Sequence, residues 1–129
     1  MPNLAVWTPR VLSLLRIAAA LSFISHGTMK LLNFPVPFKG SMNPMITASG
    51  VLELVGGALL VLGLFTRPVA FILSGMMAVA YFMVHVKMGG IVPALNQGEA
   101  AYLYTFVFLF LAVAGGGEWS LDAKVRKRP

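Results

Sequence analysis

The sequence predicts an all-α integral membrane protein, a four-helix bundle with its N and C termini in the cytoplasm. Of its 129 residues, 58% are hydrophobic and 11% are charged, whereas soluble domains are about 45–50% apolar. Four apolar runs, each close to the length that crosses a bilayer, are separated by short segments rich in proline, glycine or charge. They give expected spans at residues 11–32, 46–65, 69–88 and 99–115. A chain of this length leaves no room for a separate soluble domain, so we expect one transmembrane domain over residues 1–129.

The first span, residues 11–32, carries its ionisable side chains towards its two ends. Pro9 comes just before it, where proline is tolerated at the start of a helix. Arg16 lies near the first end, and we expect its long stem to carry the guanidinium to the membrane surface. His26 and Lys30 are four residues apart and therefore share one helix face near the second end.

One carboxylate, Glu53, lies well inside the second span, residues 46–65. An ionisable side chain at membrane depth costs about 2.5–3.5 kcal/mol on insertion scales, so it usually faces the bundle interior with a partner. Gly50 and Gly57 fall on the same face as Glu53, because residues three and four apart are neighbours on a helix. We therefore expect a neighbouring helix to approach this face closely, with the carboxylate turned towards it.

The other connections are marked by residues that interrupt helices. Residues 33–44 contain three prolines with glycine, serine and asparagine, which predicts a loop, and its apolar side chains favour a loop that lies against the bundle. Residues 66–68 are expected to form a tight turn. The third span then places His85 near its far end. The fourth apolar run has only about 16 residues before a run of three glycines, which is short for a span, but we still expect it to cross.

The distribution of basic residues predicts the topology. With four spans, one side of the membrane holds Arg10, Arg16, Arg67, Lys124, Arg126, Lys127 and Arg128, and the other holds Lys30, Lys39 and Lys87. Basic residues are more frequent on the cytoplasmic side, so both termini are expected there. The same pattern accounts for the net charge of +6. We therefore expect the lipid bilayer as a partner and no binding to nucleic acid.

Each span contributes an ionisable residue to the outer half of the membrane, namely His26, Glu53, His85 and Glu99, with Lys30 close by. One interpretation is structural: Glu53 pairs with His26 or Lys30 and only specifies how the helices pack. The other is functional: the side chains surround a polar pocket that opens outwards and binds a molecule able to exchange protons or electrons. Two aromatic side chains near the outer rim, Tyr81 and Tyr102, either pack in the bundle or line this pocket.

Several classes of chemistry are excluded by residue type and spacing. The chain has no cysteine, which excludes disulfides, thiol redox catalysis and iron–sulfur ligation by this polypeptide alone. The side chains of His26, His85, Glu53 and Glu99 are adequate metal ligands. They lie at unequal depths, however, and no spacing places two of them together on one helix. We therefore expect no metal site. Phosphate-binding loops and Ser-His-Asp arrangements are absent from the sequence, which removes the common soluble enzyme classes.

A set of short motifs follows one another in a characteristic order from residue 26 to residue 123. They are His26-Gly27 with Lys30-Leu31, Glu53 with Gly56-Gly57, Gly63-Leu64-Phe65-Thr66-Arg67-Pro68, Ala80-Tyr81-Phe82 with His85, Asn96-Gln97-Gly98-Glu99, and Gly117-Glu118-Trp119-Ser120-Leu121-Asp122-Ala123. In these features the chain resembles the DoxX family of small four-helix bacterial membrane proteins.

The resemblance implies a multi-pass protein of the bacterial plasma (inner) membrane that serves as an oxidoreductase subunit. The family is named with a relative, the small subunit of an archaeal thiosulfate:quinone oxidoreductase. Some members are linked to oxidative-stress complexes with soluble partners. For this chain we therefore expect soluble redox enzymes or a homo-oligomer as protein partners.

The leading hypothesis is a membrane redox component that binds a quinone or a similar small molecule in the outer-half pocket. Glu53 and His26 are the expected catalytic groups, because a carboxylate and an imidazole among apolar side chains can supply protons beside a quinone ring. The expected substrate-binding residues are Lys30, Tyr81, His85, Glu99 and Tyr102. The sequence does not specify the cofactor. The rival hypothesis is a non-enzymatic membrane scaffold that anchors soluble redox enzymes through its basic C-terminal tail.

Overall fold

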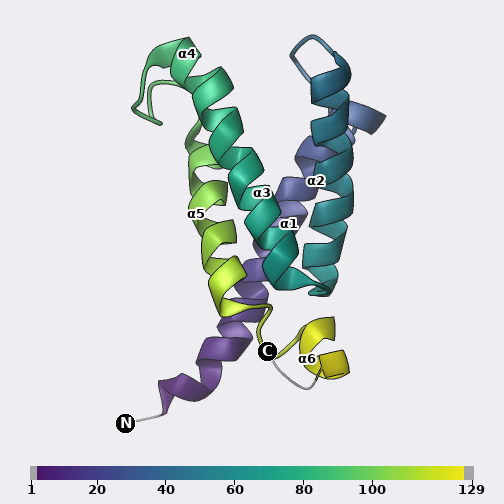
Figure 1. The fold of residues 1–129 in the computed structure, drawn as a ribbon, viewed down its shortest axis with the longest axis vertical. Helices are drawn as coiled ribbons and strands as arrows, with labels where there is room; N and C mark the ends of the chain where they lie inside the picture. The colour runs from purple at the N-terminus through teal and green to yellow at the C-terminus, as the bar shows by residue number, and fades with distance from the viewer. Residues whose placement is uncertain (1–2, 127–129) are drawn as a thin grey trace.

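The computed structural model describes residues 3–126 and shows only helices, turns and loops within them. The elements are η1 (Leu4–Trp7), α1 (Thr8–Leu32), α2 (Pro44–Leu62), α3 (Thr66–Ala80), the π-helical turn η2 (Tyr81–His85), α4 (Val86–Gly89), α5 (Glu99–Ala114) and α6 (Leu121–Arg126). Figure 1 shows the four long helices side by side as a bundle. The predicted all-α membrane bundle is confirmed. Of the predicted basic tail, Lys127 and Arg128 lie outside the described residues.

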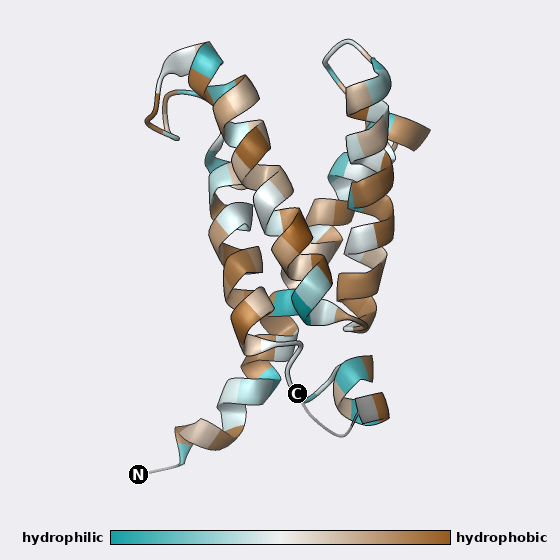
Figure 2. Cartoon of the chain, in the orientation of Figure 1, coloured by the Kyte–Doolittle hydropathy of each residue, from teal (hydrophilic) through white to brown (hydrophobic). Residues whose placement is uncertain are grey.

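Within the described part of the chain, three helical segments are long and apolar enough to cross a membrane: Leu4–Leu32, Pro44–Leu62 and Thr66–Gly89. Helix α5 is apolar but has only 16 residues. It therefore extends about 24 Å, against a hydrocarbon core of about 30 Å. Apolar residues cover much of the long helices in Figure 2, and large ones such as Phe71 and Val113 are exposed, as expected for a surface in contact with lipid.

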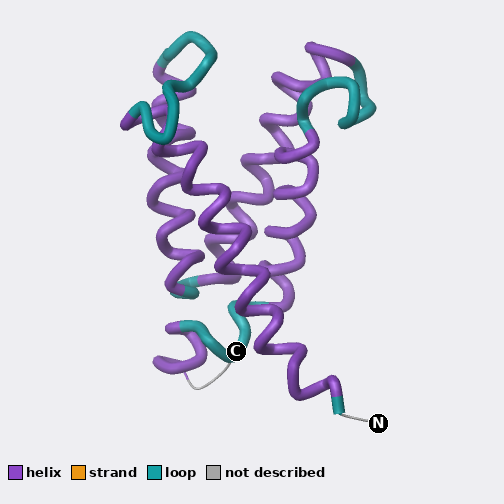
Figure 3. Tube along the Cα trace, turned by 180° about the vertical axis from the view of Figure 1, so that it is seen from behind, coloured by secondary structure: helices purple, strands orange, loops and turns teal. Residues whose placement is uncertain are grey.

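The bundle has two distinct ends. The start of α1 and the short helix α6 lie at one end, which we call the terminal end (Figure 1). The loop 33–43 and the connection 90–98 lie at the other, the loop end, apart from each other in both views (Figures 1 and 3). This arrangement agrees with four crossings. That the terminal end faces the cytoplasm remains a prediction from the charges.

The turn between α2 and α3 lies at residues 63–65, earlier than the expected 66–68. Helix α2 ends at Leu62 because Gly63 adopts a left-handed conformation with φ of 70°, which glycine allows without steric cost. Helix α3 begins at Thr66, so Pro68 lies in its first turn, where proline is tolerated. The Asp122 carboxylate accepts hydrogen bonds from the backbone N–H groups of Phe65 and Thr66, both at 2.8 Å. It satisfies donors that the start of a helix leaves unpaired.

The four long helices form two antiparallel pairs. Helix α1 packs along α2, and α3 packs along α5, while contacts between the pairs are fewer. The two pairs separate towards the loop end (Figure 1). Their common core contains Phe23 of α1, Leu60 of α2, Leu73 of α3 and Phe108 of α5, all at most 1% exposed. The rings of Phe23 and Phe108 meet edge to face with centroids 4.9 Å apart.

Helices α1 and α2 cross with their backbones close together, as the small residues predicted. A methyl group added at Gly27 would lie 3.0 Å from the carbonyl oxygen of Gly50 and 3.0 Å from the amide nitrogen of Leu54. Because both neighbours are backbone atoms, they cannot move aside without separating the helices. Gly27 therefore sets the distance between α1 and α2.

Arg16 is buried at the terminal end, with 1% of its surface exposed, so the expectation that it reaches the membrane surface is wrong. Its Nε donates to the carbonyl of Leu60 at 2.7 Å, its Nη2 to the carbonyl of Trp119 at 2.9 Å, and its Nη1 to the carbonyl of Gly116. The last carbonyls of a helix have no partner within the helix, and they favour a cation. These carbonyl oxygens accept the hydrogen bonds of the guanidinium, which offsets the cost of burying Arg16.

We expect Gly27→Ala to weaken the bundle. The added methyl group has no space at the crossing of α1 and α2, and overpacking of this kind costs about 1–3 kcal/mol. The free energy of unfolding in detergent should fall by that amount. The matched control is Gly75→Ala on α3, where a methyl group would meet nothing within 4 Å. Equal stability of the two variants would contradict the close crossing.

Candidate functional site

A buried ion pair joins α1 and α2 near the loop end. Lys30 Nζ lies 2.6 Å from Glu53 Oε1, and the side chains are 14% and 2% exposed. Lys30 Nζ also donates a hydrogen bond to Ser49 Oγ at 3.1 Å. The sequence predicted either His26 or Lys30 as the partner of Glu53, and in the structure the partner is Lys30. A short, charge-assisted contact is among the stronger hydrogen bonds in proteins.

The close helix crossing explains how this pair forms. Gly27 lies three residues before Lys30, and Gly50 three residues before Glu53, so both glycines share a face with the charged residue that follows them. A methyl group at Gly27 would come within 3.1 Å of Glu53 Cβ. The absence of a side chain at Gly27 thus brings the stem of Glu53 against α1, where the long side chain of Lys30 reaches its carboxylate.

Phe38, in the loop 33–43, covers Lys30. Its ring centroid lies 5.5 Å from Lys30 Nζ, within range of a cation–π interaction. The backbone N–H of Phe38 donates to the carbonyl of Met29 at 3.2 Å, which holds the loop against the end of α1. Gly40 lies close to the Phe38 ring: a methyl group added at Gly40 would be 2.6 Å from Phe38 Cε2. The loop therefore packs on the bundle as expected, and it screens Lys30 at the loop end.

His26 faces α5 and not Glu53. Its ring meets that of Tyr104 edge to face, with centroids 6.0 Å apart. The Tyr104 hydroxyl lies 2.5 Å from Ser22 Oγ, and Tyr104 is 8% exposed. Ser22, His26 and Lys30 are spaced four residues apart along α1 and therefore share one face of this helix. Ser22, His26, Lys30, Glu53 and Tyr104 thus form one group, which we call the ion-pair cluster.

Tyr104 and Ser22 were not among the residues that the sequence suggested. The signal for Tyr104 was the spacing of Ala101, Tyr104, Phe108 and Leu111, which places these residues on one face of α5, and all four are buried. A tyrosine on a buried face needs a partner for its hydroxyl. Nothing comparable marks Ser22 in the sequence.

The second histidine, His85, belongs to a different group of contacts. Its Nδ1 lies 3.2 Å from the carbonyl oxygen of Asn96. Asn96 itself is buried, with 1% of its surface exposed. The Asn96 side-chain amide donates to the Tyr81 hydroxyl at 2.9 Å and to the carbonyl of Gly90 at 2.8 Å. The Tyr81 hydroxyl donates to the carbonyl of Ile91 at 2.5 Å. These contacts hold the connection 90–98 against η2, and we call them the loop network.

Of the remaining predicted residues, Tyr102 contacts the loop network, and Glu99 begins α5 directly after the connection 90–98. The ring of Tyr102 is 5.7 Å from that of Tyr81, and both Tyr102 and Glu99 are exposed. Within residues 3–126, hydrogen bonds, ion pairs and ring contacts do not join this network to the ion-pair cluster. The structure therefore divides the predicted site residues into two groups. His26, Lys30 and Glu53 belong to the ion-pair cluster, and Tyr81, His85, Glu99 and Tyr102 lie at or next to the connection 90–98. The described residues contain no group of three or more histidine, aspartate or glutamate side chains that could hold a metal ion.

These features define a small multi-pass membrane protein with a buried ion pair in the half of the bundle nearest the loop end. Residues 11–86 match the DoxX family, and the chain belongs to that family. A Haemophilus influenzae protein described as "Uncharacterized protein" is 46% identical over 99% of this chain and 100% of its own length. The Escherichia coli protein "Inner membrane protein YphA" is 31% identical over 90% of this chain and 91% of its own length.

No solved structure matches the chain. The family, the inner-membrane relative and the three candidate spans together confirm the expected location, a bacterial plasma membrane crossed several times.

We expect Phe38→Ala to expose Lys30. In nanodiscs, where both membrane faces are accessible, an amine-reactive ester too polar to enter the bilayer should label Lys30 several times faster in this variant. Mass spectrometry of the peptides measures the rate. Lys39 and Lys87, both exposed, provide references in the same molecule. Phe34→Ala is the control, because the Phe34 ring is 68% exposed and belongs to the same loop. A rate that changes equally in both variants would contradict the screening by Phe38.

Proposed function

We propose that the protein is a membrane redox component that binds a quinone-type molecule beside the ion-pair cluster. One observation carries the proposal: the Lys30–Glu53 pair lies at membrane depth next to a second polar pair, Ser22 and Tyr104, with His26 in contact with the latter. Structural packing needs only the ion pair. The additional hydroxyls of Ser22 and Tyr104 and the imidazole of His26, in the same apolar surroundings, favour a site that recognises a polar ligand.

The chemistry of a quinone suits these groups. Reduction to the quinol adds two electrons and two protons, one proton to each carbonyl oxygen. The Lys30 ammonium and the Tyr104 or Ser22 hydroxyl are donors for those oxygens. Glu53 and His26 are groups that can hold and release protons close to them. In this proposal the electrons come from a reduced soluble redox protein at the membrane surface, because the polypeptide itself has no thiol chemistry to offer.

Access to the cluster is proposed from the lipid and not from the water at the loop end. Phe38 screens Lys30 at the loop end. Ser22 is exposed on the surface of α1, and His26 is half-buried one turn further along the same helix. A quinone dissolves in the hydrocarbon core, so a site that opens sideways into the bilayer meets it directly. This differs from the outward-opening pocket expected from the sequence.

The test is the quinone content of the purified protein. Protein prepared in mild detergent, or reconstituted with a short-chain quinone, should hold about one quinone per chain after washing, measured by solvent extraction and chromatography. Glu53→Gln should lower that content at least tenfold. Glu99→Gln makes the same chemical change at an exposed position of the loop network and should leave the content unchanged.

Loss of stability must be separated from loss of the site. Glu53→Gln leaves Lys30 buried without its partner, and breaking such a pair costs about 3–5 kcal/mol. The double variant Lys30→Gln with Glu53→Gln removes both charges and should regain much of that stability, yet still lack quinone. A double variant that keeps its quinone, or a wild-type protein that never retains any, would refute the proposal.

A further inference from the structure

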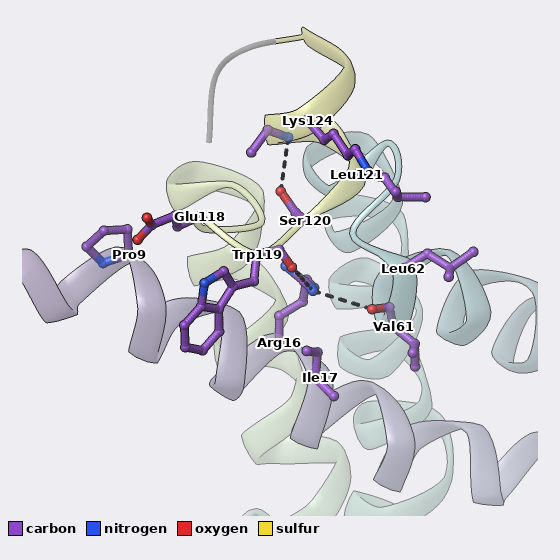
Figure 4. A pocket seen from close by; sticks show the side chains of 11 residues that line it. Pro9, Arg16, Ile17, Val61, Leu62, Glu118, Trp119, Ser120, Leu121 and Lys124 are labelled. Carbon is purple, nitrogen blue, oxygen red and sulfur yellow. Dashed lines mark hydrogen bonds between the residues drawn. The ribbon is translucent and has the colours of Figure 1, made fainter.

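A groove lies at the terminal end, away from the ion-pair cluster. It runs between the first half of α1, the end of α2 and the segment that leads into α6, and it has a volume of about 950 Å³ (Figure 4). That volume is within the range of about 300–1,000 Å³ that small-molecule sites occupy. We call it the terminal groove. It is open to the surface over most of its extent.

The walls of the groove are fixed by hydrogen bonds within the protein. Arg16 binds the carbonyls of Leu60 in α2 and of Trp119 in the C-terminal segment, which ties the two walls to α1. Ser13 Oγ donates to the carbonyl of Gly116 at 3.1 Å and accepts from the N–H of Trp119 at 2.9 Å. The groove therefore keeps its shape without a ligand, which lowers the entropic cost of binding one.

The lining is mostly apolar on the side of the long helices, where the Arg16 guanidinium is bound by main-chain carbonyls. Lys124 lies on the side of the C-terminal segment. Ile17, Val61 and Leu62 form the part that belongs to the long helices. Trp119 and Lys124 lie on the side of the C-terminal segment, and in Figure 4 Lys124 and Ile17 are at opposite sides of the groove. Tryptophan is enriched at the boundary between membrane and water. The groove therefore extends from membrane depth to the aqueous surface.

The charge at the aqueous side is positive. Glu118 also lines the groove, but its carboxylate is paired with Arg10 Nε at 3.1 Å. The side chain of Lys124 is exposed and forms neither an ion pair nor a hydrogen bond with any residue in the described part of the chain. Lys124 is therefore the lining charge that is left for a ligand, and it selects an anion.

We propose that the terminal groove binds one anionic phospholipid. An acyl chain lies along Ile17, Val61 and Leu62, and the phosphate lies beside Lys124. The order of the lining is that of the lipid itself, apolar at membrane depth and charged at the surface. An inorganic anion would leave the apolar wall uncovered, and a neutral lipid would leave Lys124 without a counter-charge. This proposal does not depend on quinone binding at the other end of the bundle.

The test is the choice between two lipids. The full-length protein is placed in nanodiscs of equimolar phosphatidylglycerol and phosphatidylcholine with identical acyl chains, and native mass spectrometry counts the lipids that remain bound. Wild-type protein should retain one phosphatidylglycerol. Lys124→Glu should lower its ratio to phosphatidylcholine about fivefold or more. Arg67→Glu makes the same change of charge at an exposed position of the terminal end outside the groove, and should have no effect.

A second variant tests the apolar wall. Leu62 is 52% exposed, so Leu62→Gln does not disturb the core, and it should weaken retention of both lipids several-fold. Retention of the two lipids in equal amounts by the wild type would overturn the proposal. So would an equal loss in the Lys124 and Arg67 variants, which would indicate a diffuse cationic surface. A lipid-free dimer would show that a second copy of the chain covers the groove.

Discussion

The close crossing of α1 and α2 is the constraint on which the loop-end half of the structure depends. Gly27 allows the two backbones to approach until Glu53 lies against α1, and that approach brings its carboxylate to Lys30. Two charges taken out of water repay the desolvation only when their geometry is good. The same close crossing places Lys30 beside Ser49 and within cation–π range of Phe38, so the loop 33–43 and the ion pair both depend on it.

Helix α1 carries a buried cation towards each end of the bundle, and the two cations have different kinds of partner. Lys30 neutralises a carboxylate on the neighbouring helix. Arg16 is bound directly by carbonyl oxygens of the end of α2 and of the C-terminal segment. Guanidinium suits this second task because its planar group has five donors in fixed directions. The terminal end is thereby held by main-chain acceptors, which depend on the backbone path more than on residue type.

Periodicity and composition were sufficient for the parts of this structure that are local in sequence. They predicted the four long helices, a loop at residues 33–44 and the buried face of Glu53, because each depends on neighbours a few residues away. They did not predict the short helix α6. The choice of Lys30 over His26 depends on the rotation of α1 about its axis, which no short pattern reveals. Arg16 is bound by Leu60 and Trp119, which are 44 and 103 positions away, and Tyr104 by Ser22, which is 82 positions away. Periodicity does not reach partners at such distances. For His85 and Tyr81, a shared depth in the membrane was a poor guide, because residues at one depth can face different helix pairs.

The distance in sequence between Arg16 and its acceptors has a consequence for biogenesis. Arg16 is made about 100 residues before Gly116 and Trp119. While the ribosome is still translating the later helices, its guanidinium is already in or near the bilayer and lacks these two carbonyls. These acceptors reach Arg16 only after residues 116–119 have been made and lie against α1. The terminal end therefore assembles after all four long helices have been synthesised, which makes it a late step in the folding of this protein.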